Sequence, residues 1–89
     1  MRIDVFLRLA GLLKTRTTAA RACDGGFVSV NDRTARPSTL VAQGDSVSLV
    51  LPDGRALVVR VESIPEGRSV PRGERRGLYT EITGESSGE

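Results

Sequence analysis

Lys14, Thr15, Arg16 and Thr17 form a basic, hydroxyl-bearing cluster where one short helix is expected to give way to another. Cations are unfavourable at the start of a helix, because the positive end of the helix dipole prefers anions. Lys14 and Arg16 should therefore cost a few tenths of a kcal/mol unless a negative group lies nearby. A phosphate group would supply that charge, held by backbone N–H groups, a threonine hydroxyl and the two cationic side chains. The cluster alone leaves open the alternative of a solvated basic turn.

The charges are divided unevenly along the chain. Residues 1–36 carry seven cations against three carboxylates, whereas residues 37–89 carry six cations against eight carboxylates. Twelve of the thirteen cations are arginine, the side chain best suited to bidentate phosphate contact. The first part of the chain therefore favours a polyanionic partner such as RNA. Only Phe6, Phe27 and Tyr79 are aromatic, so platforms for stacking single-stranded bases are scarce.

The composition argues against catalysis. With 89 residues the chain has room for one domain, and it contains no histidine and one cysteine, Cys23. This leaves no ligand set for zinc, no histidine-based triad and no internal disulfide, and we expect Cys23 to be buried. Asp4, Asp24 and Asp45 do not form an acid–base set; their expected roles are ion pairing, a helix end and a turn. We therefore expect no enzymatic activity, no metal and no cofactor.

No apolar run approaches the roughly 20 residues of a membrane span. The first residues also lack the apolar core of a signal peptide. We expect a cytoplasmic protein without a membrane partner.

Two amphipathic helices are predicted near the N-terminus. Apolar residues fall at steps of three and four along residues 2–13, which predicts a helix whose end is weakened by Gly11. A second helix is expected over about 16–24, capped by Thr15 or Thr17 and ended by two glycines. Its buried face would consist of the small residues Ala19, Ala22 and Cys23.

From residue 27 the apolar period changes to two, which predicts strands. The first strand covers 27–30, Asn31-Asp32 forms a tight turn, and the chain returns over 33–36. A strand with Val47, Leu49 and Leu51 on one face leads through a turn at 52–54 to a longer strand over 56–64. The predicted fold is α+β, with two short N-terminal helices packed on a small, mainly antiparallel sheet.

The C-terminal third divides into three segments. Residues 65–77, rich in proline, glycine and arginine, are expected to form a loop. Residues 78–82 are expected to complete the sheet as a short strand, and residues 83–89 to form a disordered acidic tail. The predicted domain covers residues 1–64, and its four recognisable motifs lie within 2–51.

Four motifs in a fixed order give the chain a resemblance to the RNA-binding domain named after small-subunit ribosomal protein S-four, the alpha-L fold. They are Arg2-Ile3-Asp4 with Leu7, Lys14-Thr15-Arg16 with Ala19, Gly26 with Val28, Val30 and Asn31, and Pro37-Ser38 with Val41 and Gly44-Asp45. One position departs from the family pattern. The hairpin turn is Asn31-Asp32 rather than Asn-Gly, which adds a negative charge at its tip.

A stand-alone chain with this helix junction, and with Leu78-Tyr79-Thr80-Glu81 near its end, is similar to the RqcP and fifteen-kilodalton heat-shock families of bacterial ribosome quality control. The resemblance implies binding to rRNA of free large ribosomal subunits that still hold peptidyl-tRNA. It also implies support of C-terminal tail addition directed by a partner, RqcH. The acidic end favours the short RqcP type, because the heat-shock members carry a basic extension. We expect a ribosome-associated monomer.

The residues expected to contact RNA bring cations, hydroxyl groups or an amide to the helix pair and the hairpin: Arg2, Arg8, Lys14, Thr15, Arg16, Thr17, Arg21, Asn31, Arg33 and Arg36. Helical RNA is recognised mainly by shape and phosphate, so cations on a rigid helix pair would suffice. Two alternatives stay open. One is a general structured-RNA-binding or ribosome-assembly factor, and the other is a protein-interaction module that offers the edge of its sheet.

Overall fold

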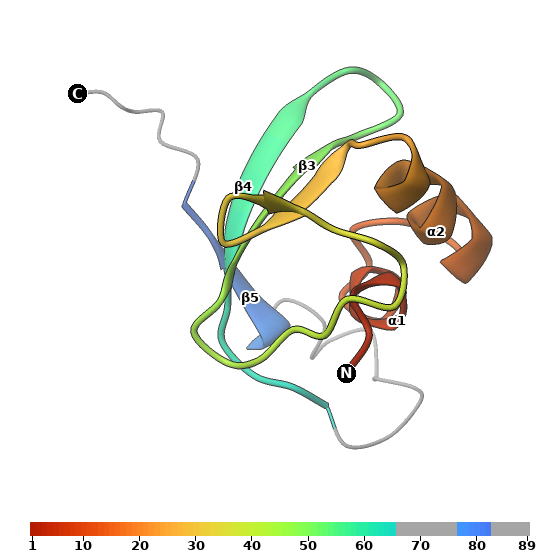
Figure 1. Ribbon diagram of the computed structural model, residues 1–89. Helices are drawn as coiled ribbons and strands as arrows, with labels where there is room; N and C mark the ends of the chain where they lie inside the picture. The colour runs from red at the N-terminus through yellow and green to blue at the C-terminus, as the bar shows by residue number, and fades with distance from the viewer. Residues whose placement is uncertain (66–76, 83–89) are drawn as a thin grey trace.

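The computed structural model describes residues 1–65 and 77–82, in which two helices lie on one side of a five-stranded sheet (Figure 1). Every neighbouring pair of strands is antiparallel, in the order β2-β1-β3-β4-β5. This is the predicted α+β architecture. The elements are α1 (Ile3–Leu9), α2 (Arg16–Asp24), β1 (Val28–Val30), β2 (Arg33–Thr34), β3 (Ser46–Val50), β4 (Ala56–Val61) and β5 (Tyr79–Glu81). Most of the expected loop at 65–77 and all of the expected tail at 83–89 lie outside the described residues.

Helix α1 is shorter than the predicted helix over residues 2–13, because it ends at Leu9. Gly11 adopts a φ of +78°, a left-handed conformation that stops a right-handed helix. The N–H groups of Leu12 and Leu13 then both donate to the carbonyl of Leu7, at 3.0 and 3.2 Å. This tight turn returns Leu13 to the core, where it is buried.

Helix α2 begins and ends as predicted, and the structure selects its cap. The Thr15 hydroxyl accepts a hydrogen bond from the Thr18 N–H at 3.0 Å, so Thr15 is the N-cap rather than Thr17. Ala19 and Cys23 are buried, and small side chains at these positions let α2 approach α1 closely. Asp24 is the last residue of the helix, the helix-end role expected for it.

The sheet is built around β1 and β3. The hairpin from β1 to β2 turns at Asn31 and Asp32, whose φ angles of +52° and +69° suit a tight two-residue turn. Strand β1 is one residue shorter than predicted, since Phe27 precedes it with half of its surface exposed. Strand β4 ends at Val61 rather than at residue 64, and β2 covers two residues of the predicted return segment.

The core lies between α1 and one face of the sheet. Phe6 and Leu7 of α1 are fully buried, as are Val28, Val47 and Val59 from three adjacent strands. The segment after β2 covers the N-terminus of α1: the Ile3 N–H donates to the Thr39 carbonyl at 2.7 Å, and the Val41 N–H donates to Met1 at 2.9 Å. These backbone bonds take the place of a side-chain cap on α1. The first sequence motif, at Arg2-Ile3-Asp4, and the last, which begins at Pro37-Ser38, therefore lie next to each other in the fold.

Candidate RNA-binding surface

Asp4 joins Arg2 and Arg16 at the junction of the two helices. One carboxylate oxygen, Oδ2, accepts from Arg2 Nη2 at 3.1 Å and from Arg16 Nε at 3.3 Å. The Asp4 side chain is 2% exposed, whereas the two arginine side chains are 43% and 54% exposed. A buried carboxylate thus holds two guanidinium groups that also reach the surface.

This ion-pair triad identifies the negative group that the helix-start cations require. Arg16 is offset by Asp4, in the ion-pairing role expected for that aspartate, so a bound phosphate is not needed to explain a cation at this position. Each guanidinium carries five N–H donors, and one nitrogen of each is engaged on Asp4. Both guanidinium side chains are about half exposed, so their remaining donors are available to phosphate oxygens. Oδ1 of Asp4 is buried without a hydrogen-bond partner in the described part of the chain.

Lys14 does not share the Asp4 carboxylate with Arg16, and its expected contact with a phosphate stays a prediction. It lines a depression together with Leu12, Asp53 and Arg55, on the side of the molecule where β3 turns into β4. Arg21 borders an adjoining apolar groove. Helix α2 therefore carries two separate cations, with Arg16 paired to Asp4 of α1 and Arg21 at the border of the groove.

Arg36 lies on the same side as Arg2. The two residues line a depression of about 600 Å³ that is closed at one side by Cys23 and Asp24 at the end of α2. Arg33 is exposed on the edge strand β2. Among the residues that the structure describes, the side chains of Lys14, Arg21, Arg33 and Arg36 make no ion pair. These four cations can therefore meet an external anion without breaking an internal contact.

The other residues expected to contact RNA differ in whether their side chains already form contacts within the protein. The Thr15 hydroxyl caps α2 and also contacts the Thr18 hydroxyl at 2.9 Å, while Thr17 is exposed. Arg8 is half-buried on α1.

Asn31 is engaged inside the protein. Its amide donates to Asp45 Oδ1 at 3.1 Å, and its carbonyl oxygen accepts from the Ser46 N–H at 3.0 Å. Asp45 also accepts from the Ala42 N–H at 2.9 Å, which is the turn role expected for it. These contacts fix the hairpin to the start of β3, so the structure gives Asn31 a structural task at the position where the sequence suggested RNA contact.

Cys23 is buried beneath the helix junction, as expected. Burial, together with smaller contributions from the nearby charges of Asp4 and Asp24, raises the pKa of its thiol from 9.0 to about 11. The thiol is therefore protonated at neutral pH and is a poor nucleophile.

Residues 1–65 and 77–82 contain neither a metal-binding cluster nor a membrane-spanning helix. No group of three or more His, Cys, Asp or Glu side chains in these ranges could hold a metal ion. None of the helices in this described part is long and apolar enough to cross a membrane.

Comparison with known proteins decides the family. The model of the S4 domain matches residues 1–47, which hold both helices and the first hairpin. A relative from Halalkalibacterium halodurans, named RQC P-site tRNA stabilizing factor, is 38% identical over 80 residues, which is 89% of this chain and 86% of the relative. The chain belongs to the RQC P-site tRNA stabilizing factor family of S4 domain proteins.

The family match extends over the whole chain. The Bacillus subtilis protein of the same name is 33% identical over 90 residues and is covered completely by the alignment, as is this chain. Among solved structures, trimeric heat shock protein 15 of Vibrio cholerae superposes with a TM-score of 0.80 at 31% identity, covering 92% of this chain and 81% of that one. The expected resemblance to the RqcP and fifteen-kilodalton heat-shock families is confirmed.

The S4 domain fold explains why the sequence motifs are spaced as they are. The first and last motifs meet where α1 packs against residues 37–41, and the second places Arg16 against Asp4. Asp4 was expected to form an ion pair, but its partners Arg2 and Arg16 were not predicted. The short spacing between Arg2 and Asp4, together with the basic residue at the start of α2, was the signal available for it.

Proposed function

We propose that this protein is a non-catalytic factor that binds rRNA and peptidyl-tRNA on large ribosomal subunits during ribosome quality control. The proposal is carried by the buried Asp4 carboxylate, which fixes Arg2 and Arg16 at the surface of the helix junction. Relatives named for stabilising a P-site tRNA support the same role. A rigid pair of guanidinium groups suits the phosphate backbone of structured RNA, which proteins recognise chiefly by shape and charge.

The remaining unpaired cations extend this contact area on either side of the helix pair. Arg36 shares a depression with Arg2, and Arg33 lies beside it on β2. Lys14 and Arg21 lie on the other side of α2, where they can contact a second RNA segment. Cations on two sides of one helix suit a factor that bridges rRNA and tRNA. Thr15 and Thr17 at the start of α2 add hydroxyl groups, and Arg8 on α1 adds a further cationic group.

The cellular setting belongs to the same proposal. The factor acts as a cytoplasmic monomer and supports the addition of C-terminal tails by an RqcH-type partner. Its contribution is binding energy, since the described residues bring no set of catalytic groups together.

The binding partners can be identified by crosslinking the tagged protein to RNA in cells and sequencing what is recovered. We expect large-subunit rRNA together with tRNA, and loss of both when Arg2 and Arg16 are replaced by alanine. Recovery of diverse small RNAs without large-subunit rRNA would instead indicate a general RNA-binding factor. A protein partner that survives nuclease treatment, without specific RNA, would favour an interaction module.

A further inference from the structure

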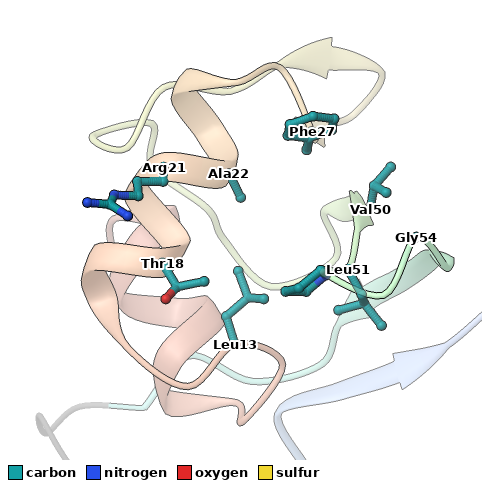
Figure 2. A pocket seen from close by; sticks show the side chains of 9 residues that line it. Leu13, Thr18, Arg21, Ala22, Phe27, Val50, Leu51 and Gly54 are labelled. Carbon is teal, nitrogen blue, oxygen red and sulfur yellow. The ribbon is translucent and has the colours of Figure 1, made fainter.

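An apolar groove of about 420 Å³ lies between α2 and the end of β3. Leu13, Ala22, Phe27, Val50 and Leu51 contribute apolar groups to its lining, and Figure 2 shows the Leu13 and Ala22 side chains turned toward the space between α2 and the end of β3. Its volume is within the range of about 300–1,000 Å³ that is typical of small-ligand sites. Phe27 is 52% exposed and Val50 38% exposed, so the groove presents apolar surface to solvent.

The ring of Phe27 is held in place although half of it is exposed. Its backbone N–H donates to Ala22 at 2.9 Å, and its carbonyl accepts from the Val50 N–H at 3.0 Å. The ring lies directly over the backbone of Gly25, where an added Cβ would come within 2.8 Å of Cε2. Gly25 thus leaves space for the ring, and the two backbone hydrogen bonds fix the main chain of Phe27 beside the groove. A fixed, exposed aromatic face is suited to stacking.

Cations border the apolar surface. A second depression, lined by Lys14 and Arg55, shares Leu13, Thr18, Leu51 and Pro52 with the groove, so the two run into one another. Arg55 pairs with Asp53 at 2.9 Å, which leaves Lys14 and Arg21 as the uncompensated charges of this border in the described chain. Figure 2 shows the Arg21 side chain extending from α2 into solvent, away from the apolar floor. The occupant must therefore combine a flat apolar face with neighbouring negative charge.

We propose that this groove binds an unpaired nucleotide of RNA, with its base stacked on Phe27 and its flanking phosphates near Lys14 and Arg21. The inference rests on the proposed RNA-binding function and adds a second contact, on the opposite side of α2 from the Asp4 triad. Bases inside a helix are already stacked and cannot enter the groove, so the site selects bulged or looped nucleotides. It gives the factor a way to distinguish a particular RNA fold from duplex RNA in general.

The test uses a fluorescent reporter at the groove. The chain contains no tryptophan, so Phe27→Trp introduces a single one, whose emission should be quenched when a base stacks on it. We expect quenching by hexaadenylate and little by an RNA duplex of similar charge. Ile82→Trp, exposed just after β5 and two strands away from β3, is the matched control and should respond to neither.

A second measurement removes the stack without a reporter. Phe27→Leu should bind hexaadenylate about tenfold more weakly, as loss of one base–aromatic stack predicts, whereas Phe27→Tyr should bind normally. Thermal melts should show that both variants remain folded, since the ring is half exposed.

The outcomes separate this inference from the proposed function. Normal binding of hexaadenylate and of large subunits by Phe27→Leu, with weak subunit binding by Arg16→Ala, would overturn the nucleotide site and leave the proposed function standing. Normal subunit binding by both variants would overturn the proposed function. Quenching of the Phe27→Trp reporter by an acidic amphipathic peptide, but not by hexaadenylate, would make the groove a protein-docking site and overturn the inference.

Discussion

The carboxylate of Asp4 lies 3.3 Å from Nε of Arg16 and joins the first turn of α1 to the first residue of α2. A negative charge in the first turn of one helix thereby offsets a positive charge at the start of the next, where the helix dipole disfavours it. The same oxygen holds Arg2. Folding of the helix pair and the geometry of the proposed RNA contact therefore depend on one buried group.

Replacing Arg16 with alanine should reduce both stability and binding. The dipole argument alone predicts equal or higher stability, but the variant leaves Asp4 buried with one cation fewer, which we expect to cost about 1–2 kcal/mol of unfolding free energy. Binding to large subunits should weaken by about 1–3 kcal/mol through loss of a charge-assisted phosphate contact. Denaturant unfolding and subunit binding assays measure the two effects.

Arg60→Ala, which removes an exposed cation from β4, is the control and should leave both stability and subunit binding nearly unchanged. Unchanged subunit binding by Arg16→Ala would show that Arg16 is not part of the contact.

Asp4→Asn tests whether the arrangement of the arginines matters beyond their charge. The substitution removes a negative charge, so non-specific attraction to RNA should increase. A neutral amide cannot hold two guanidinium groups as the carboxylate does, and we expect specific binding to large subunits to weaken by about 1 kcal/mol. Competition binding against an unrelated RNA duplex separates the two effects. Tighter binding to both partners would contradict the positioning role of Asp4.

Salt should weaken binding to large subunits steeply. With about four to six phosphates neutralised, the affinity should fall by roughly 10² or more between 50 and 200 mM salt. The slope for Arg36→Ala should be shallower, because one phosphate contact is lost. Filter binding or anisotropy over a salt series gives both slopes, and a flat response would rule out phosphate contacts as the main source of affinity.

Removal of the C-terminus should affect stability in two steps. Deleting residues 83–89 should leave the melting temperature unchanged. Deleting residues 78–89 also removes Leu78, which is buried and whose carbonyl accepts hydrogen bonds from the N–H groups of Glu62 and Ser63. We expect this larger deletion to cost about 2 kcal/mol or more. Equal melting temperatures of the two truncated chains would show that β5 contributes nothing to the fold.

Cys23 should make stability fall at alkaline pH. Its pKa is raised from 9.0 to about 11, so the folded state favours the protonated thiol, and the associated stabilisation is complete below pH 9 and is lost as pH rises toward 11. The stability difference between the native chain and Cys23→Ala should shrink by about 1 kcal/mol between pH 8 and pH 10. Denaturant unfolding of both chains at the two pH values measures it. A constant difference would show that the thiol ionises equally in both states.

Local patterns in the sequence determined most of the elements. The apolar period predicted both helices and the strands, and Thr15 with the glycines after Asp24 fixed the bounds of α2. Asn31-Asp32 predicted the hairpin turn because both residues tolerate a positive φ. Propensity, capping and turn chemistry act over a few residues, so they can be read from neighbours in the chain. The length of α1 was overestimated because apolar spacing continues past Gly11, where the backbone turns.

The assignment of partners was decided only by the tertiary structure. The position of Arg16 at a helix start indicated that it needs a negative neighbour, for which the sequence suggested a bound phosphate. In the structure, the packing of α1 on α2 supplies Asp4 as that neighbour. In the same way Asn31 binds Asp45, and Phe27 lies exposed over Gly25 beside an open groove. These contacts depend on how helices and strands are placed relative to one another. That placement arises from burial summed over the whole core, which no single stretch of sequence encodes.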